Sequence, residues 1–209
     1  MQHRIALLAA LATAGIPATA LAQVANGNFD SGFASWVVKD SSFAPALGQT
    51  CANTPYATTT RNTNRRGTAP AAGRVAQATP FIVYAPGHWT LCRHLEQMVY
   101  VPRGTQLKFA AKIGDGIYGS AYQISPATLS LLVADGKKTT ALFQQSGQNI
   151  VCGNGQVPCP VYNAHAVDMS RYWGKTVRLV FRGVTSVWNG QLGGIAEPSY
   201  AYIDNIRLE

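Results

Sequence analysis

Acidic side chains are scarce in this sequence. Only nine Asp and Glu residues occur among 209, and they lie one by one along the chain. Hydrolases need paired carboxylates, a nucleophile with its base, or a metal-activated water. The four histidines form no H-x-x-x-H pair, and Ser41, Ser42 and Ser146 lack the context of a nucleophile elbow. We therefore expect a non-catalytic binding protein, with a small polysaccharide hydrolase or lyase whose groups assemble only in space as an alternative.

Long hydrophobic runs are absent after the first 22 residues. The early run, residues 5–14, follows His3 and Arg4 and precedes an A-x-A cleavage pattern at Ala20-Leu21-Ala22. These features predict a secretory signal peptide over residues 1–22 and a mature domain over residues 23–209. No later run is long enough to span a membrane. We expect one secreted or periplasmic domain.

Cysteines are few but even in number. In an exported protein, four cysteines predict two disulfides, with three possible pairings. Cys152 and Cys159 bracket a turn-forming segment, so we pair them with each other and Cys51 with Cys92. A zinc site is the alternative, but neither pair has C-x-x-C spacing.

Charged residues make up 12% of the chain, with a net charge of +8. This balance favours acidic glycans or the anionic cell envelope as partners, with a basic surface of no specific partner as the alternative. Nucleic acid is not expected as a partner, because the sequence has no dense basic cluster; the three residues that come nearest to one are Arg61, Arg65 and Arg66. The oligomeric state is not determined by the sequence.

Short alternating segments separated by Gly- and Pro-containing turns predict an all-β fold. The alternation is clearest over residues 106–113, 176–184 and 200–209. A single helical turn is expected between Asp168 and Gly174. We predict one antiparallel β-sandwich, a jelly roll of about eight or nine strands. The remaining predicted strands lie in residues 26–38 (with a turn at 31–32), 74–84, 91–101, 128–134 and 139–145.

Asp204 interrupts the apolar pattern of the closing segment. It shares the parity of Ile206 and Leu208, so an unbroken strand would point its carboxylate into the core. There it needs a cation, several N–H donors, a metal or a proton. If the first and last strands pair, Asp30 and Asp204 come together and favour a hard cation such as calcium. Alternatively, a β-bulge flips the parity and Asp204 accepts backbone hydrogen bonds.

Four stretches, taken in order, resemble galactose-binding-like jelly-roll domains, which include many carbohydrate-binding modules. The resemblance implies a jelly roll with a structural calcium ion joining its first and last strands, for which Asp30 and Asp204 are the acidic ligands. It fixes no function by itself. The stretches are Asn26-Gly27-Asn28-Phe29-Asp30 with Trp36, residues 95–102, residues 168–177 and residues 202–206.

Sugar recognition requires exposed aromatic side chains with polar partners. Packing in the core or at an edge is the alternative role for each aromatic candidate. Outward Lys108, Lys112, Arg178 and Arg182 would form a basic stripe if their strands were neighbours. A structural or adhesive cell-envelope protein that binds other proteins is the second functional hypothesis. The aromatic candidates, all expected in loops, are Tyr56, Trp89, Tyr118, Tyr122 and Trp188, with Arg61 and Arg65 as polar partners.

Overall fold

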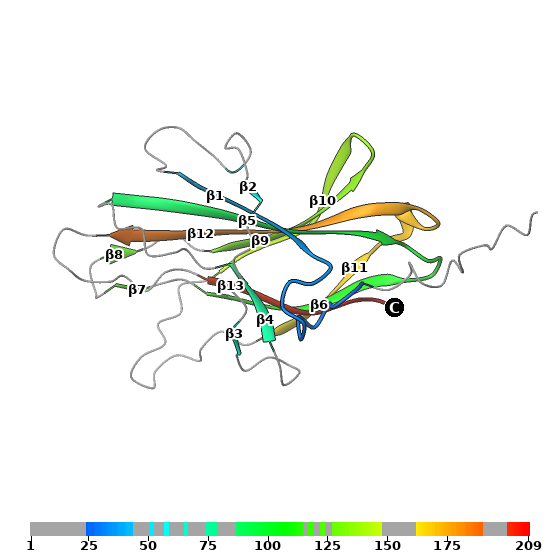
Figure 1. Ribbon diagram of the computed structural model, residues 1–209, viewed down its shortest axis with the longest axis horizontal. Coiled ribbons are helices and arrows are strands. Elements are labelled where there is room, and N and C mark those ends of the chain that lie inside the picture. The colour runs from blue at the N-terminus through cyan, green and yellow to red at the C-terminus, as the bar shows by residue number, and fades with distance from the viewer. Residues whose placement is uncertain are drawn as a thin grey trace, which may run out of the picture.

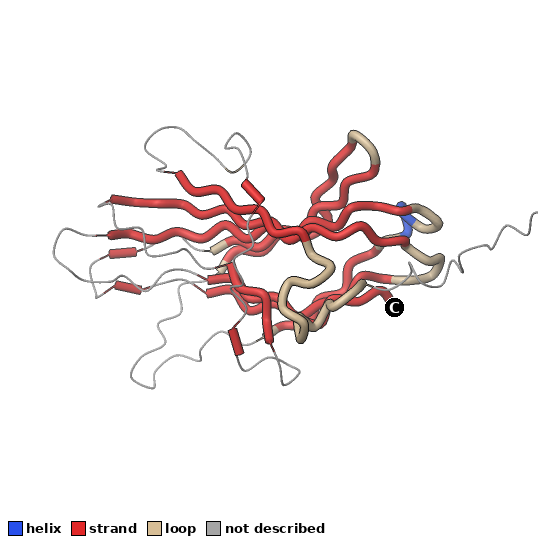
Figure 2. Tube along the Cα trace, in the orientation of Figure 1, coloured by secondary structure: helices blue, strands red, loops and turns tan. Residues whose placement is uncertain are grey.

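The computed structural model describes residues 24–43, 51, 57–58, 65–66, 74–78, 87–114, 117–118, 122–123, 127–147, 162–189 and 200–209. These residues form two antiparallel sheets and one small hairpin (Figure 1). Strands dominate the fold, and the helix drawn in Figure 2 is a single 3-10 turn at Ser170–Tyr172. The predicted all-β sandwich is confirmed.

Nine of the labelled strands have five residues or more, which agrees with the predicted eight or nine; the other four have two residues each. The strands are β1 (Val37–Phe43), β2 (Ala57–Thr58), β3 (Arg65–Arg66), β4 (Arg74–Ala78), β5 (Gly87–Tyr100), β6 (Gln106–Gly114), β7 (Ile117–Tyr118), β8 (Tyr122–Gln123), β9 (Thr128–Asp135), β10 (Lys138–Ser146), β11 (Asn163–Asp168), β12 (Thr176–Asn189) and β13 (Tyr200–Leu208).

The two sheets are built from strands distant in sequence. The six-stranded sheet has the order β10-β9-β12-β5-β1-β2, and the five-stranded sheet has the order β11-β6-β13-β4-β3. β5 and β12, fourteen residues each, pair along their whole length from Tyr100–Thr176 to Gly87–Asn189. β9 and β10 form the predicted hairpin, with Gly136 in the left-handed conformation at its turn.

Alternation along the strands builds the core. Leu95, Val99, Leu179 and Phe181 from the six-stranded sheet meet Phe109 and its neighbours from the five-stranded sheet in one buried cluster. The intervening residues face outward, because successive side chains of a strand point to opposite faces of the sheet. Because the odd-numbered residues Leu95, Val99, Leu179 and Phe181 face the core, the even-numbered residues of β5 and β12 lie on the outer face of the six-stranded sheet.

The prediction of a strand at the beginning of residues 26–38 is wrong. The described chain starts with a series of turns, and β1 begins only at Val37. β1 pairs with β5 and β2, whereas the closing strand β13 pairs with β6 and β4. The first and last strands therefore do not pair. Left-handed Asn26, Phe29 and Ser35 explain why this stretch turns rather than extends.

Sequence patterning placed the other long strands, with three main differences. β11 was not predicted, and β5 begins at Gly87 rather than at the predicted residue 91. β12 runs to Asn189, further than the predicted end at residue 184. The predicted helical turn is the 3-10 turn, where Asp168 Oδ1 accepts a hydrogen bond from Ser170 N at 2.8 Å. Within the described chain, no helix has the length and apolar character needed to cross a bilayer.

Candidate functional site

Asn26 organises the N-terminal turn. Its side-chain Nδ2 donates to the carbonyl oxygens of Gly32 and Ala34 at 2.9 and 3.0 Å, and its Oδ1 accepts from Ser31 N at 3.1 Å. The indole Nε1 of Trp36 donates to the Asn26 carbonyl oxygen at 3.1 Å. A short amide side chain can close a turn in this way by satisfying local backbone groups. Asn26 and Trp36, which carried the family resemblance, thus shape the same turn.

Gln97 of β5 fixes this turn to the six-stranded sheet. Its Oε1 accepts from Ala25 N at 2.9 Å, and its Nε2 donates to the carbonyl oxygens of Ala25 and Ser35, each at 2.9 Å. Gln97 is only 8% exposed and belongs to the inward-facing set of β5. A buried amide needs partners, and here the turn provides them.

The same turn contacts the closing strand of the opposite sheet. The pairing of β4 with β13 ends at Ile203, and beyond it Ile206 N donates to the Gly27 carbonyl oxygen at 3.0 Å. A Cβ atom on Gly27 would lie 1.9 Å from the Ile206 carbonyl oxygen, so only glycine fits. The turn therefore takes the place of β4 along this part of the β13 edge.

A β-bulge in β13 decides the position of Asp204. The register with β6 shifts between Asp204 and Arg207, and Asn205 is left-handed with φ of 53°. Ile203 and Ile206 therefore both reach the core, while Asp204 alternates with Ile203 and leaves the core face. The alternative prediction, a β-bulge at Asp204, is confirmed. The prediction that an unbroken strand points the carboxylate of Asp204 into the core is wrong.

Asp204 is nevertheless buried, with 1% of its surface exposed. Its Oδ1 accepts one hydrogen bond, 2.8 Å from Asn205 N, among the described residues. Burial is the main cause that raises the pKa of Asp204 to about 6, and the charge of nearby Asp30 raises it further. Asp30 is exposed and bonds to Asn28 Nδ2. The turn, rather than strand pairing, brings the two carboxylates near each other.

Asp204 and Asp30 are better suited to lie close together with a hard cation between them than without one. A cation would remove both the desolvation cost of Asp204 and its repulsion from Asp30. Calcium accepts carboxylate, amide and backbone oxygens in a flexible geometry. No cluster of three or more Asp, Glu, His or Cys side chains occurs in the described part of the chain. Calcium here would therefore need neutral oxygens, such as Asn28 Oδ1, as further ligands.

The predicted sugar-binding aromatics are not all in loops. Trp89 lies in β5 and Trp188 in β12, and register pairs Trp188 with His88 and Val187 with Trp89. Tyr118 and Tyr122 are register partners in the β7–β8 hairpin. The loop placement of these four residues is therefore corrected to strands: β5 and β12 extend beyond their predicted ends, and the β7–β8 hairpin forms where no strand was predicted.

Of the remaining predicted ligand residues, only Arg65 lies within the described chain. Arg65 lies in β3 opposite Val75. Tyr56 and Arg61 lie outside the described residues, as do the Cys152–Cys159 pair and the signal peptide. The predicted basic stripe is wrong: Lys108 and Lys112 lie in β6 of one sheet, and Arg178 and Arg182 in β12 of the other.

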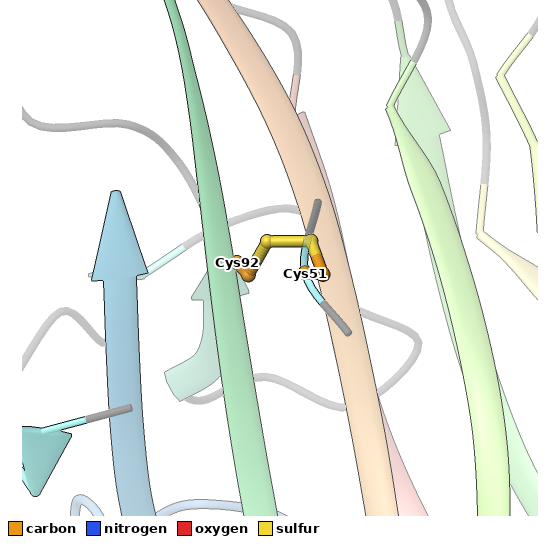
Figure 3. The surroundings of a disulfide bond; sticks show 2 residues. All are labelled: Cys51 and Cys92. Carbon is orange, nitrogen blue, oxygen red and sulfur yellow. A yellow bond between two sulfur atoms is a disulfide. The ribbon is translucent and has the colours of Figure 1, made fainter. Parts of the chain in front are cut away.

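The predicted Cys51–Cys92 disulfide is present. Cys92 belongs to the outward-facing set of β5, and it is completely buried. In Figure 3 the bond leaves β5, and Cys51 lies in front of the neighbouring β12. The disulfide thus holds a distant part of the chain over the outer face of the six-stranded sheet.

A row of hydrogen-bonding residues crosses that outer face next to the disulfide. Register places Lys39 opposite His94, His94 opposite Arg182, and Arg182 opposite Ser130, on four neighbouring strands. We call Lys39, His94, Arg182 and Ser130 the outer row. The sequence pointed only to Arg182. The sequence did not show that β1, β5, β12 and β9 are neighbours, so it could not predict that these four residues form a row.

Glu96 is the next outward-facing residue of β5 after His94, and two cations and His94 lie close to its carboxylate. Lys39 Nζ is 2.7 Å and Arg178 Nη1 3.7 Å from Glu96 Oε2, and His94 Nδ1 is 3.6 Å from Oε1. Burial is the main cause that lowers the pKa of His94 to about 4; Arg182 and Lys39 lower it further, and Glu96 opposes them. At neutral pH, His94 is therefore an uncharged hydrogen-bonding group between two cations.

The inner face has its own ion pair. Arg93, 1% exposed, donates from Nε and Nη2 to the two oxygens of Asp40 at 2.6 and 2.9 Å. Its register partner on β12 is Gly183, which has no side chain to compete for this space. A bidentate pair of this kind satisfies a buried guanidinium, so we assign Arg93 and Asp40 a structural role.

Solved structures of low sequence identity are similar to this chain. The carbohydrate-binding module TmCBM61, solved with β-1,4-galactotriose, has a TM-score of 0.48 and 12% identity, over 89% of this chain and 96% of its own. The K1 cleaved adhesin domain of Lys-gingipain from Porphyromonas gingivalis W83 has a TM-score of 0.49 and 16% identity, over 87% and 95%. A CBM4 structure has a TM-score of 0.34 and 12% identity, over 87% and 98%.

The predicted similarity to carbohydrate-binding modules is thus found again at the level of structure. No protein-family model and no curated protein sequence matches the chain. With TM-scores below 0.5, these structures assign no function to the chain.

Proposed function

We propose that this protein is a secreted, non-catalytic module that binds carbohydrate. The observation that carries the proposal is the gathering of aromatic positions at one end of the sandwich. Trp89 lies near the start of β5, Trp188 near the end of β12, and the Tyr118–Tyr122 pair in β7–β8; these strand ends share one end of the long axis in Figure 1. Aromatic rings there would pack against the C–H faces of sugar rings.

Two further observations support this proposal. The Cys51–Cys92 disulfide fits an oxidising compartment, as expected of an exported protein. Two histidines, His94 and His165, are suited to structure rather than proton transfer, because both have a pKa lowered mainly by burial. His165 packs between Phe109 and Phe143, with ring centroids 5.1 and 4.7 Å away.

We also propose calcium as a structural ion held by Asp30 and Asp204. Bound there, it would join the N-terminal turn to the closing strand and neutralise the buried carboxylate. The raised pKa of Asp204 and the proximity of Asp30 support this assignment. The ion would stabilise the fold and would not contact the sugar.

A glycan array of the oxidised protein, with affinity electrophoresis of three tryptophan variants, tests carbohydrate binding. We expect Trp188→Ala and Trp89→Ala to weaken binding about tenfold, since an aromatic contact contributes roughly 0.5–1.5 kcal/mol beyond the apolar area that it buries. Trp173→Ala is the control. Trp173 is 40% exposed and bonds through Nε1 to Thr105 O, next to the 3-10 turn at the opposite end of the molecule. Absence of binding to every glycan would reject the proposal.

Protein adhesion is a second candidate, favoured by one observation. Met98 is 60% exposed and Val37 is 47% exposed, although both lie in the six-stranded sheet. Val37 is the register partner of Glu96, so Met98 is its diagonal neighbour on the outer face. Exposed apolar side chains in a sheet are typical of contact surfaces. Loss of a protein partner in Met98→Lys, with glycan binding absent in the wild type, would favour adhesion.

A further inference from the structure

The outer row contains hydrogen-bonding groups that the described protein leaves unused. Ser130 is 1% exposed, yet its Oγ has no hydrogen-bond partner. The Nε of Arg182, its register partner, also has none, and no carboxylate in the described part of the chain pairs with Arg182. Ser41 Oγ, on the next outward row of β1, is a third such atom. Buried polar groups normally find partners, so three such atoms on one face indicate a place for a ligand.

The charge of this face selects the chemistry of that ligand. Lys39, Arg178 and Arg182 contribute three positive charges, and Glu96 contributes one negative charge that Lys39 and Arg178 already approach. Among the described residues, Arg182 therefore has no carboxylate that compensates its charge. A guanidinium is suited to planar carboxylates and to phosphate-like oxyanions. An anionic group is the natural partner for Arg182, and hydroxyl groups suit Ser130 and His94.

The dimensions and the neighbouring residues favour a chain rather than a small ion. Four adjacent strands carry the outer row, so it extends over roughly 14 Å, three times the spacing between strands. In the next row, Glu96 lies between its register partners Val37 and Val180, and Met98 is the following outward residue of β5; of the three apolar side chains, Val37 and Met98 are exposed. Sugar rings have apolar faces and polar edges, and a polymer of acidic sugars combines both with negative charge.

We propose that an anionic polysaccharide binds across the outer row, with Arg182 contacting its acidic groups and Ser130 its hydroxyl groups. This inference rests on the carbohydrate binding proposed above and names where the ligand lies and its chemical class. Val184, the register partner of Cys92, lies between Arg182 and Trp188 on β12, and Cys51 lies in front of β12 there, so the outer row is a site separate from the aromatic end.

Binding of polygalacturonate, dextran sulfate and neutral galactan to the oxidised protein tests this inference. We expect Arg182→Gln to weaken binding of the anionic polymers roughly tenfold or more, as loss of a charge-assisted hydrogen bond predicts. Ser130→Ala should weaken it less, because only a hydroxyl is removed. If the positive charge alone matters, Arg182→Lys should bind the anionic polymers more tightly than Arg182→Gln does. If the planar guanidinium is required, the two variants should bind about equally weakly. Preference for polygalacturonate or dextran sulfate distinguishes a carboxylate from a sulfate ligand.

Arg171→Gln is the control, because it removes one exposed positive charge from the 3-10 turn, away from this face. It should change binding less than twofold at 0.15 M salt, where distant exposed charges are screened. Thermal melts of all variants show whether each is folded. Ser130→Ala, which adds no atoms, keeps the test valid if Arg182→Gln is unstable.

The outcomes separate this inference from the proposed function. If the wild type binds neutral galactan and Trp188→Ala abolishes binding while Arg182→Gln and Ser130→Ala do not, the outer row is rejected and carbohydrate binding stands. If Arg182→Gln and Arg171→Gln weaken the binding of anionic polymers equally, the attraction depends only on the net charge of the protein, and the outer row is again rejected as the binding site. If no polymer binds the wild type, both proposals fail.

Discussion

The backbone N–H of Ile206 donates to the carbonyl oxygen of Gly27 at 3.0 Å, which joins the beginning of the described chain to its closing strand. Gln97 of β5 holds the turn that contains Gly27, and β5 and β13 belong to different sheets, so this contact also links the two layers of the sandwich. The contact depends on an N-terminal turn shaped by Asn26 and held by Gln97.

Gly27→Ala should destabilise the protein by about 2 kcal/mol or more. The added Cβ would meet the carbonyl oxygen and carbon of Ile206 at 1.9 and 2.9 Å, and backbone atoms cannot move aside cheaply. Gly104→Ala is the control: Gly104 has φ of +80° but no atom within 4 Å of the added Cβ, so only about 1 kcal/mol of backbone strain is expected. Urea unfolding measures both, and equal losses would contradict the close contact.

Gln97→Leu should reduce the free energy of unfolding by roughly 2–4 kcal/mol. It leaves Ala25 N–H and the carbonyl oxygens of Ala25 and Ser35 without their partner, and buried unpaired groups cost about 1–3 kcal/mol each. Gln144→Leu, on an exposed position of β10, is the control. Hydrogen exchange should show the N-terminal turn opening first in Gln97→Leu. Unchanged protection of that turn would contradict its attachment through Gln97.

Calcium should raise the melting temperature at pH 7.5, and a chelator should reverse the rise. An ion at 100 times its Kd stabilises the native state by about 2.7 kcal/mol, equivalent to roughly 5–10 °C for a domain of this size. Asp204→Asn keeps the side-chain shape and should abolish the response. Asp135→Asn, which removes an exposed carboxylate paired with Lys175, should retain it. A melting temperature independent of calcium in the wild type would reject the metal and leave Asp204 as a buried acceptor.

The contribution of His94 to stability should fall as the pH is lowered from 6.5 to 4, while the raised pKa of Asp204 acts in the opposite direction over part of this range. The pKa of His94 is about 4 in the folded protein and about 6.5 when exposed. Between these values the unfolded chain binds a proton that the native protein does not, so acid favours unfolding. The shift corresponds to at most about 3 kcal/mol. Its contribution is fully present above pH 6.5 and has been lost once the pH falls below 4.

Comparison of the wild type with His94→Gln isolates this contribution from that of other titrating groups. The advantage of the wild type, measured by denaturant unfolding at several pH values, should shrink between pH 6.5 and 4. A difference that stays constant over this range would show that His94 titrates normally.

Much of the fold could be predicted because local patterns determined it. Leu107, Phe109 and Ile113 alternate cleanly, and the structure places them in the core. The turn at residues 24–35 could not be predicted from alternation, since its shape depends on side-chain hydrogen bonds of Asn26 and on Gln97, which lies 72 residues from Ala25. The bulge at Asp204 was foreseen only as an alternative, because parity alone cannot count the extra residue.

The candidate site was harder to predict for the same reason. Trp89 and Trp188 were identified as residues, but their pairing through β5 and β12 depends on contacts between distant strands. Lys39, His94 and Ser130 carry no motif, and they become a row only when four strands assemble in register. A signal was present in β5, where Arg93 and Gln97 interrupt the apolar set of Leu91, Leu95 and Val99. Polar residues at inward positions indicate specific buried contacts.

Titration of the ¹⁵N-labelled protein with an oligogalacturonate, followed by amide chemical shifts, tests the central claim most directly. The account predicts saturable shifts at Arg182, Ser130 and His94, with Leu107 and Phe109 of the opposite sheet unchanged, and the shifts should diminish at high salt. Repeating the titration with sulfated and neutral oligosaccharides covers the other ligand classes. A protein whose spectrum responds to none of these oligosaccharides would contradict both carbohydrate binding and the role of the outer row.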